Sequence, residues 1–190
     1  MAVRRQELIG TKAPLEVVIT PMRRRHLRSV SRIEQVTSGR PWSLGLFMGE
    51  LSLPESREYL VARLGHQVVG YAGMMLVVDE GHVTTIAVDP AWQRNGIGTR
   101  MLLQLARRGI ARGARQLTLE VRVGNTGAQA MYRSFGFAPA GIRKAYYVEN
   151  NEDALIMWAH DIDLPSYRDR LDAIDASVPG STSIEGFDIR

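Results

Sequence analysis

The segment Gln93-Arg94-Asn95-Gly96-Ile97-Gly98 constrains this chain more than any other part of the sequence. It follows residues 82–88, which have the apolar pattern of a strand, and it precedes an amphipathic helix expected over about 99–112. Glycine allows a tight turn and a close approach of a ligand to the backbone. The first N–H groups of a helix have no intrahelical partner. Strand, turn and helix together predict a site for an anion such as a pyrophosphate.

Two better-known phosphate loops do not fit these residues. A dinucleotide fingerprint G-x-G-x-x-G would need glycine at Met101. A Walker A loop needs Gly-Lys-Ser/Thr, and no lysine lies between Lys12 and Lys144. An ordinary strand-to-helix turn, with glycines for packing, stays open from the loop alone.

The pattern around this loop predicts an α+β domain. Helices are expected over 24–38, 44–51, 99–112, 125–135 and 163–176, and strands over 15–20, 57–64, 67–78, 82–88, 115–121, 137–147 and 154–160. A strand meander followed by alternating helices and strands favours one mixed, mostly antiparallel sheet of about six or seven strands flanked by helices. We expect the domain over 15–162, an N-terminal extension over 1–14, and an acidic C-terminal tail over 163–190. The tail is expected to hold a short helix and then a flexible linker at 178–183.

Charge is distributed unevenly along the chain. Residues 89–144 carry ten basic and two acidic side chains, whereas residues 145–190 carry three basic and ten acidic ones. The basic block indicates either a polyanionic partner or a solvated arginine-rich face. Aromatic residues are not interleaved with the basic ones as in RNA-binding surfaces, so we expect no direct nucleic-acid binding. The acidic tail is predicted to fold its stripe of Tyr167, Leu171 and Ile174 onto the basic domain, either within a subunit or between subunits.

Several classes of site are excluded by composition. The 190 residues include no cysteine, which removes disulfides, cysteine-ligated metals and cysteine nucleophiles. The four histidines (His26, His66, His82, His160) lack metal-ligand spacing, and we expect no metal. No apolar run is long enough to span a bilayer, and the start of the sequence lacks the pattern of a signal peptide. We therefore expect a cytoplasmic protein with no membrane partner.

The residues around the loop resemble the GNAT family of N-acetyltransferases. Gln93 to Gly98 matches the motif Q/R-x-x-G-x-G/A, and the agreement extends to Ile86-Ala87-Val88-Asp89-Pro90, Leu119-Glu120-Val121-Arg122, Asn125, Met131-Tyr132 and Phe135-Gly136-Phe137. Within the family the set is most similar to the bacterial ribosomal-protein-alanine N-acetyltransferases (RimI type), through Ile33-Glu34-Gln35, Pro41-Trp42-Ser43, Tyr146-Tyr147 and residues 152–157. Arg40 and Val148 depart from that pattern, in segments that line the acceptor groove of such enzymes.

The resemblance implies a GNAT fold with acetyl-CoA as cosubstrate. In that fold the strands at 82–88 and 115–121 are parallel and splay apart, and the pantetheine arm pairs with backbone groups of Ile86 and Val88. The pyrophosphate lies on amides from Arg94 to Thr99. The implied coenzyme-binding residues are Ile86, Ala87, Val88, Gln93, Arg94, Asn95, Gly96, Ile97, Gly98, Thr99, Asn125 and Tyr132.

The implied reaction is acetyl transfer from acetyl-CoA to a primary amine. An α-amine has a pKa of about 7.7–8.0 and a lysine amine one of about 10.4, so a modest base suffices for a protein N-terminus. Glu120, acting directly or through a water, is the candidate base; from the residues alone it could instead be a strand carboxylate paired with Arg115 or Arg122. The resemblance gives Tyr132 the role of general acid toward the leaving thiolate, with a core tyrosine as the other interpretation. The N–H of Val88 is the implied oxyanion donor.

Trp42, Tyr146 and Tyr147 are the expected acceptor-binding residues, although each could serve only as a core or strand aromatic. The expected function is acetylation of a protein's N-terminal α-amine, with the N-terminal alanine of a small-subunit ribosomal protein as acceptor. Two alternatives stay open: an acetyltransferase for lysine or for small-molecule amines of the aminoglycoside type, and an acyl-CoA-binding regulatory module. We expect a monomer or a weak homodimer.

Overall fold

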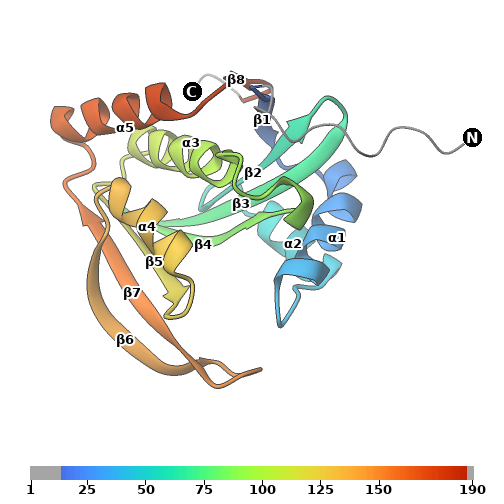
Figure 1. The fold of residues 1–190 in the computed structure, drawn as a ribbon, viewed down its shortest axis with the longest axis horizontal. Coiled ribbons are helices and arrows are strands. Elements are labelled where there is room, and N and C mark those ends of the chain that lie inside the picture. Colours follow the sequence, from blue (N-terminus) through green and yellow to red (C-terminus); the bar gives the residue numbers. More distant parts are fainter. Residues whose placement is uncertain (1–13, 188–190) are drawn as a thin grey trace, which may run out of the picture.

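A sheet of eight strands runs through the part of the chain that the computed structural model describes, residues 14–187 (Figure 1). The strands are β1 (Glu16–Pro21), β2 (Arg57–Leu64), β3 (Gln67–Val77), β4 (Glu80–Val88), β5 (Gln116–Arg122), β6 (Ala138–Tyr147), β7 (Glu152–His160) and β8 (Ser181–Ile184). Their order in the sheet is β6-β7-β5-β4-β3-β2-β1-β8. The extension expected over 1–14 lies outside the described residues except for its last position.

The helices are α1 (Leu27–Thr37), α2 (Leu44–Leu51), α3 (Ile97–Ala111), α4 (Thr126–Ser134) and α5 (Pro165–Ser177), with 3-10 turns η1 (Arg24–His26) and η2 (Pro90–Trp92). In Figure 1, α1 and α2 lie on one side of the sheet, and α3 lies on the other with α4 and α5 beside it. None of these helices is both long enough and apolar enough to cross a lipid bilayer.

Both faces of the central strands are buried. Tyr59 and Val61 of β2 join the apolar cluster beneath α1 and α2, whereas Leu60 and Ala62 join the cluster beneath α3. Successive side chains of a strand point to opposite faces, so a strand covered on both sides is apolar at consecutive positions. This explains why β2 and β3 show near-continuous apolar runs in the sequence.

The parallel pair β4–β5 is joined at one end only. Glu80, Gly81 and His82 pair with Gln116, Leu117 and Thr118, and the two strands form no further pairs in residues 14–187. β5 pairs along its whole length with β7 instead. The divergence beyond His82 and Thr118 opens a wedge in the sheet, as the resemblance implied.

The structure corrects the number of strands and the expected linker. Eight strands are present where six or seven were expected, because Ser181–Ile184 forms β8, parallel to β1, within a segment expected to be flexible. Gly180 at φ +100° passes so close to β1 that a Cβ there would lie 2.3 Å from the carbonyl oxygen of Leu15. The buried guanidinium of Arg100 donates to the carbonyl oxygen of Pro179, at 2.6 Å, and to the hydroxyl of Thr182. Backbone pairing and one buried cation therefore order a segment whose polar side chains carry no strand pattern.

The acidic tail packs along α3. Tyr167 and Leu171 of α5 are buried in the α3-side core, and Ile174 packs against it. Arg107 of α3 forms ion pairs with Asp172, at 2.9 Å, and Asp175, at 2.8 Å. The prediction that the tail folds its apolar stripe onto the basic domain is confirmed.

Residues 178–187, which we call the C-terminal strap, follow α5. They begin beside the start of α3 and end beside its last turns. A Cβ on Gly96, at the start of α3, would lie 2.6 Å from Cγ1 of Val178. The ring of Phe187 lies 4.1 Å from the guanidinium carbon of Arg108. α5 and the strap therefore contact α3 from its last turns back to the glycine loop.

Candidate active site

The wedge between β4 and β5 forms a cleft of about 680 Å³. It collects candidate residues from distant parts of the sequence: Trp42, Ile86, Ala87, Val88, Gln93, Glu120, Asn125, Tyr132, Tyr146 and Tyr147 all line it. The other six candidates, Arg94 to Thr99, do not line this cavity. They form the helix start that directly follows Gln93.

The glycine loop has the backbone of an anion site. Gly96 is left-handed (φ 74°, ψ 4°) and stands at the N-cap of α3 without a capping side chain. The first bond inside the helix runs from the N–H of Arg100 to the carbonyl oxygen of Gly96, at 3.0 Å. The N–H groups of the three preceding residues thus have no intrahelical acceptor and lie at the positive end of the helix dipole.

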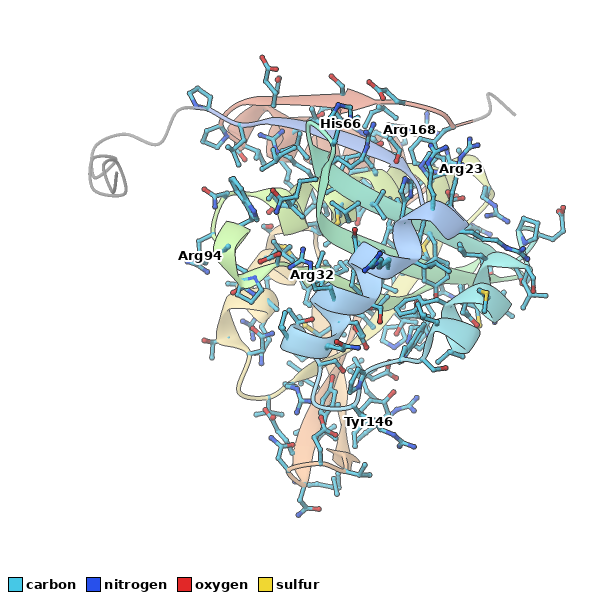
Figure 2. The ribbon with its side chains drawn as sticks, turned by 90° about the vertical axis from the view of Figure 1, so that its right-hand side faces the viewer. Arg23, Arg32, His66, Arg94, Tyr146 and Arg168 are labelled. Atoms are coloured by element: carbon cyan, nitrogen blue, oxygen red, sulfur yellow. The ribbon has the colours of Figure 1, made fainter. Side chains whose placement is uncertain are left out.

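Side chains around the loop hold its shape and add charge. Nε2 of Gln93 donates to the carbonyl oxygen of Val88, at 3.1 Å, which ties the loop to the end of β4. Nδ2 of Asn95 donates to the carbonyl oxygens of Trp92 and Gln93, each at 3.0 Å. Arg94 is exposed on the loop that leads into α3 (Figure 2). The loop therefore carries an exposed positive charge.

Glu120 points into the cleft because β5 alternates. Its neighbours Leu119 and Val121 are buried in the core, and the side chain of Glu120 is 8% exposed. One oxygen, Oε2, lies 2.7 Å from Nε2 of His82, and the other, Oε1, lies 3.1 Å from Nη2 of Arg143. The hydrogen bond with His82 lowers the pKa of Glu120, although burial acts in the opposite direction.

Neither of the ion pairs left open for Glu120 is formed. Arg115 pairs with Asp163, and Arg122 pairs with Glu149 of the β6–β7 turn and with Glu152 at the start of β7. The partners found instead, His82 and Arg143, were missed by the sequence analysis. They lie 38 residues before and 23 residues after Glu120.

Tyr132 combines both roles that the sequence left open. It is buried in the core on α4, with its ring centroid 5.8 Å from that of Phe137, and it also lines the cleft. Burial raises the pKa of its phenol, so the hydroxyl keeps its proton at neutral pH. Asn125 caps α4, its side chain accepting from the N–H of Ala128 at 3.1 Å. The cap places both residues on the β5–α4 side of the cleft.

Trp42 borders the cleft on the α1–α2 side. Its ring centroid lies 5.4 Å from that of Phe47, and the backbone N–H of Trp42 donates to Oε1 of Glu34 at 3.0 Å. The other oxygen of Glu34 accepts from the hydroxyl of Tyr71. Trp42 therefore covers the α1–α2 core and lines the cleft at once.

Tyr146 and Tyr147 border the cleft on the β6 side. Their rings are perpendicular, with centroids 5.2 Å apart. Tyr146 is 45% exposed and lies on the part of β6 that extends from the body of the molecule (Figure 2). The guanidinium carbon of Arg122 lies 3.8 Å from the ring centroid of Tyr147, and burial raises the pKa of Tyr147 to about 12.

Comparison with known proteins decides the family. Residues 25–137 match the model of the acetyltransferase (GNAT) family. The chain belongs to the GNAT family. The fold expected from the glycine loop and its flanking motifs is thereby confirmed, and so is acetyl transfer as the class of reaction.

Individual GNAT relatives are similar over most of this chain. The ribosomal protein bS18-alanine N-acetyltransferase of Escherichia coli (strain K12) is 37% identical over 135 residues, 69% of this chain and 88% of the relative. The N-alpha-acetyltransferase RimI of Mycobacterium tuberculosis is 43% identical over 121 residues, 62% of this chain and 74% of the relative. The crystal structure of the ribosomal-protein-S18-alanine N-acetyltransferase from Escherichia coli superposes with a TM-score of 0.70 at 33% identity, covering 76% of this chain and 94% of the other.

Proposed function

We propose that this GNAT enzyme transfers the acetyl group of acetyl-CoA to the N-terminal α-amine of a protein, with the N-terminal alanine of a small-subunit ribosomal protein as acceptor. The observation that carries the proposal is a cleft between splayed parallel strands, lined by Glu120 and Tyr132, in a chain similar to ribosomal-protein-alanine acetyltransferases. A ribosomal acceptor would place the reaction in the cytoplasm.

The residues of the cleft fit acetyl-CoA. The free amides of Ile97, Gly98 and Thr99, with the exposed Arg94 on the same loop, suit the pyrophosphate. Ile86 and Val88 lie on the part of β4 that β5 leaves unpaired, so their backbone can pair with the pantetheine arm. When bound, acetyl-CoA supplies the acetyl group as a thioester.

The two candidate catalytic residues line the same cleft and differ in charge. Glu120 is the basic group toward the acceptor's ammonium, which must lose a proton before the amine can attack. Tyr132 keeps its proton and can donate it to the departing thiolate. The N–H of Val88 is the proposed donor to the oxyanion.

The acceptor peptide enters on the side formed by Trp42, Tyr146 and Tyr147. All three line the cleft, and they come from the α1–α2 loop and from β6. The positions that depart from the RimI pattern, Arg40 and Val148, line the cleft on the same two sides. We therefore expect these two residues to influence which residues are accepted after the first.

A panel of peptides tests the proposal. Peptides beginning with Ala, Ser or Met are incubated with acetyl-CoA, and the acetylated nitrogen is located by mass spectrometry. A matched set has a blocked N-terminus and one lysine, and a third set contains free amines of the aminoglycoside type. We expect α-amine acetylation, fastest on the alanine peptide, and loss of turnover with Glu120→Gln.

Two outcomes would contradict the proposal. Turnover of blocked lysine peptides or free amines without any α-amine product would favour the other enzyme class. Calorimetric binding of acetyl-CoA with no turnover of any amine would favour an acyl-CoA-binding module.

A further inference from the structure

A histidine faces the reaction cleft beside the candidate base. His82 lies on β4 at the last position that pairs with β5, where the wedge begins. Its Nε2 lies 2.7 Å from Oε2 of Glu120, and both side chains line the cleft. The imidazole is the more accessible of the two, with 28% of its side chain exposed against 8% for Glu120. The pair is thus an imidazole held by a carboxylate, with the imidazole toward solvent.

The carboxylate of this pair is well stabilised as an anion. Its second oxygen, Oε1, lies 3.1 Å from Nη2 of Arg143. The hydrogen bond from His82 lowers the pKa of Glu120, burial opposes this, and the charge of Arg143 lowers the pKa further. Further titratable groups also border the cleft near the pair: Tyr146 and Tyr147 of β6 and Tyr132 of α4. Their hydroxyls keep their protons at neutral pH because burial raises all three pKa values.

A carboxylate in this setting holds a proton poorly. An α-ammonium has a pKa of about 7.7–8.0 and an ordinary glutamate one of about 4.3. Proton transfer from the first to the second is therefore unfavourable by a factor of more than about a thousand. An imidazole is in general a stronger base than a carboxylate by about two pKa units, so it accepts a proton from an ammonium more readily.

The hydrogen bond also settles which imidazole nitrogen is free. While Glu120 is ionised, the hydrogen between Nε2 and Oε2 belongs to the imidazole. The neutral ring then has its lone pair on Nδ1, for which residues 14–187 provide no hydrogen-bond partner. The free base of the pair is therefore Nδ1 of His82.

We propose that Nδ1 of His82 receives the proton from the acceptor's ammonium, while Glu120 stays ionised and holds the ring. The N–H bond of the ammonium breaks, its electron pair stays on the amine nitrogen, and the proton forms a bond to Nδ1. The imidazolium so formed lies against the carboxylate of Glu120 and returns its proton to solvent. The inference rests on the proposed function and refines its proton-transfer step: Glu120 supplies the negative charge of the basic pair, and His82 supplies the accepting atom.

The test compares variants under saturating acetyl-CoA and amine, so that kcat reports the bound complex. We expect the kcat of the wild-type enzyme to fall as the pH is lowered, because the accepting nitrogen is then already protonated. His82→Gln should lower kcat about a hundredfold or more and remove this limb of the profile, with the Kd for acetyl-CoA unchanged. Added imidazole should restore activity to His82→Ala in proportion to its unprotonated form. His66→Gln, on the exposed β2–β3 turn, is the matched histidine control and should behave as the wild-type enzyme does.

The outcomes separate this inference from the proposed function. The inference would be overturned if His82→Gln kept the kcat and the pH profile of the wild-type enzyme while Glu120→Gln was inactive. Glu120 would then remain as the base of the same reaction. If His82→Gln fails to bind acetyl-CoA, the kcat of His82→Asn and the rescue of His82→Ala by imidazole test the inference instead. Absence of rescue by imidazole would count against it. A wild-type enzyme that acetylates no amine at all would refute the proposed function, and the inference with it.

Discussion

At the scale of single residues, the cleft separates a group that stays charged from one that stays neutral. Glu120 is held as an anion by His82 and Arg143, whereas burial keeps the phenol of Tyr132 protonated. Groups whose environments displace their pKa values in opposite directions are typical of acid–base sites. Here the two opposite pKa shifts follow from the elements that carry the groups. Strand β5 directs the carboxylate of Glu120 toward His82 and Arg143, and helix α4 buries the phenol of Tyr132 in the core.

The phenol of Tyr132 gives the first prediction. Tyr132→Phe removes the proposed acid and keeps the ring, so we expect kcat to fall about a hundredfold while the Kd for acetyl-CoA changes far less. Tyr167→Phe is the matched control, since it removes a buried hydroxyl of α5 that has no hydrogen-bond partner in the described chain. Steady-state kinetics and calorimetry provide the two measurements. Equal kcat for both variants would exclude Tyr132 as the acid.

The carboxyl of Glu120 predicts a pH dependence of stability. Its pKa is lower in the folded protein than in the unfolded chain, so the folded state binds fewer protons in this range. The stabilisation is fully present above the unfolded value of about 4.3 and is lost as the pH falls through the folded pKa. The difference in free energy of unfolding between wild type and Glu120→Gln should be smaller below about pH 4 than at about pH 5. Urea denaturation from pH 3 to pH 7 measures it, and a difference independent of pH would contradict the assignment.

Sequence reasoning could identify Glu120 but not its partners. The alternation of Leu117, Leu119 and Val121 places Glu120 on the opposite face of its strand, whatever the rest of the fold. His82 and Arg143 reach it from other strands, and only the register of the sheet brings them together. The clue available in the sequence was the position of His82 on a strand already expected to be parallel to that of Glu120.

At the scale of elements, the start of α3 depends on one glycine far more than on the other. Gly96 adopts a φ of 74° and faces Val178 closely, whereas a Cβ on Gly98 would meet nothing nearer than 3.6 Å. The left-handed region costs a residue with a Cβ about 1–2 kcal/mol. The backbone at the start of α3 therefore requires glycine at position 96 but tolerates a Cβ at position 98.

This contrast predicts different effects for two alanine substitutions. Gly96→Ala should weaken acetyl-CoA binding about fivefold to thirtyfold, the equivalent of that backbone cost, and should also lower the melting temperature. Gly98→Ala should bind within about twofold of the wild type, since it adds only ordinary contacts. Isothermal calorimetry on both variants makes the comparison, and equal losses of affinity would show that the left-handed turn is not the deciding feature.

The elements that the sequence predicted least well lie in the strap. Helices with an apolar stripe and strands with alternation have local signals, and α5 was expected for that reason. β8 has the sequence Ser-Thr-Ser-Ile, and it forms because β1 offers an edge and Arg100 lies beneath Pro179 and Thr182. Such pairing depends on residues more than 150 positions away, which no local pattern reveals.

At the scale of the whole molecule, the tail is part of the folded core. Leu171 is 1% exposed and belongs to the same apolar cluster as α3 and β5. The ion pairs of Arg107 fasten α5 from outside. The acidic tail thus compensates the basic middle block on the face where α3 lies.

Leu171 gives the prediction at this scale. Leu171→Ala leaves a cavity in a packed core and should lower the free energy of unfolding by about 2–5 kcal/mol. Asp169→Ala, at an exposed position of the same helix, should change it by less than about 0.5 kcal/mol. Chemical denaturation of the full chain measures both, and a change for Leu171→Ala as small as that for Asp169→Ala would mean that α5 is only loosely docked.

The contact between Val178 and Gly96 has a consequence for how the enzyme matures during translation. The strap leaves the ribosome after every other described strand and helix, and β8 can pair with β1 only then. Until that moment the glycine loop lacks the side chain that packs against Gly96. A nascent chain stalled before residue 178 would therefore carry the whole cleft with an unsupported loop, and on the proposed function its affinity for acetyl-CoA would be complete only when synthesis has passed the strap.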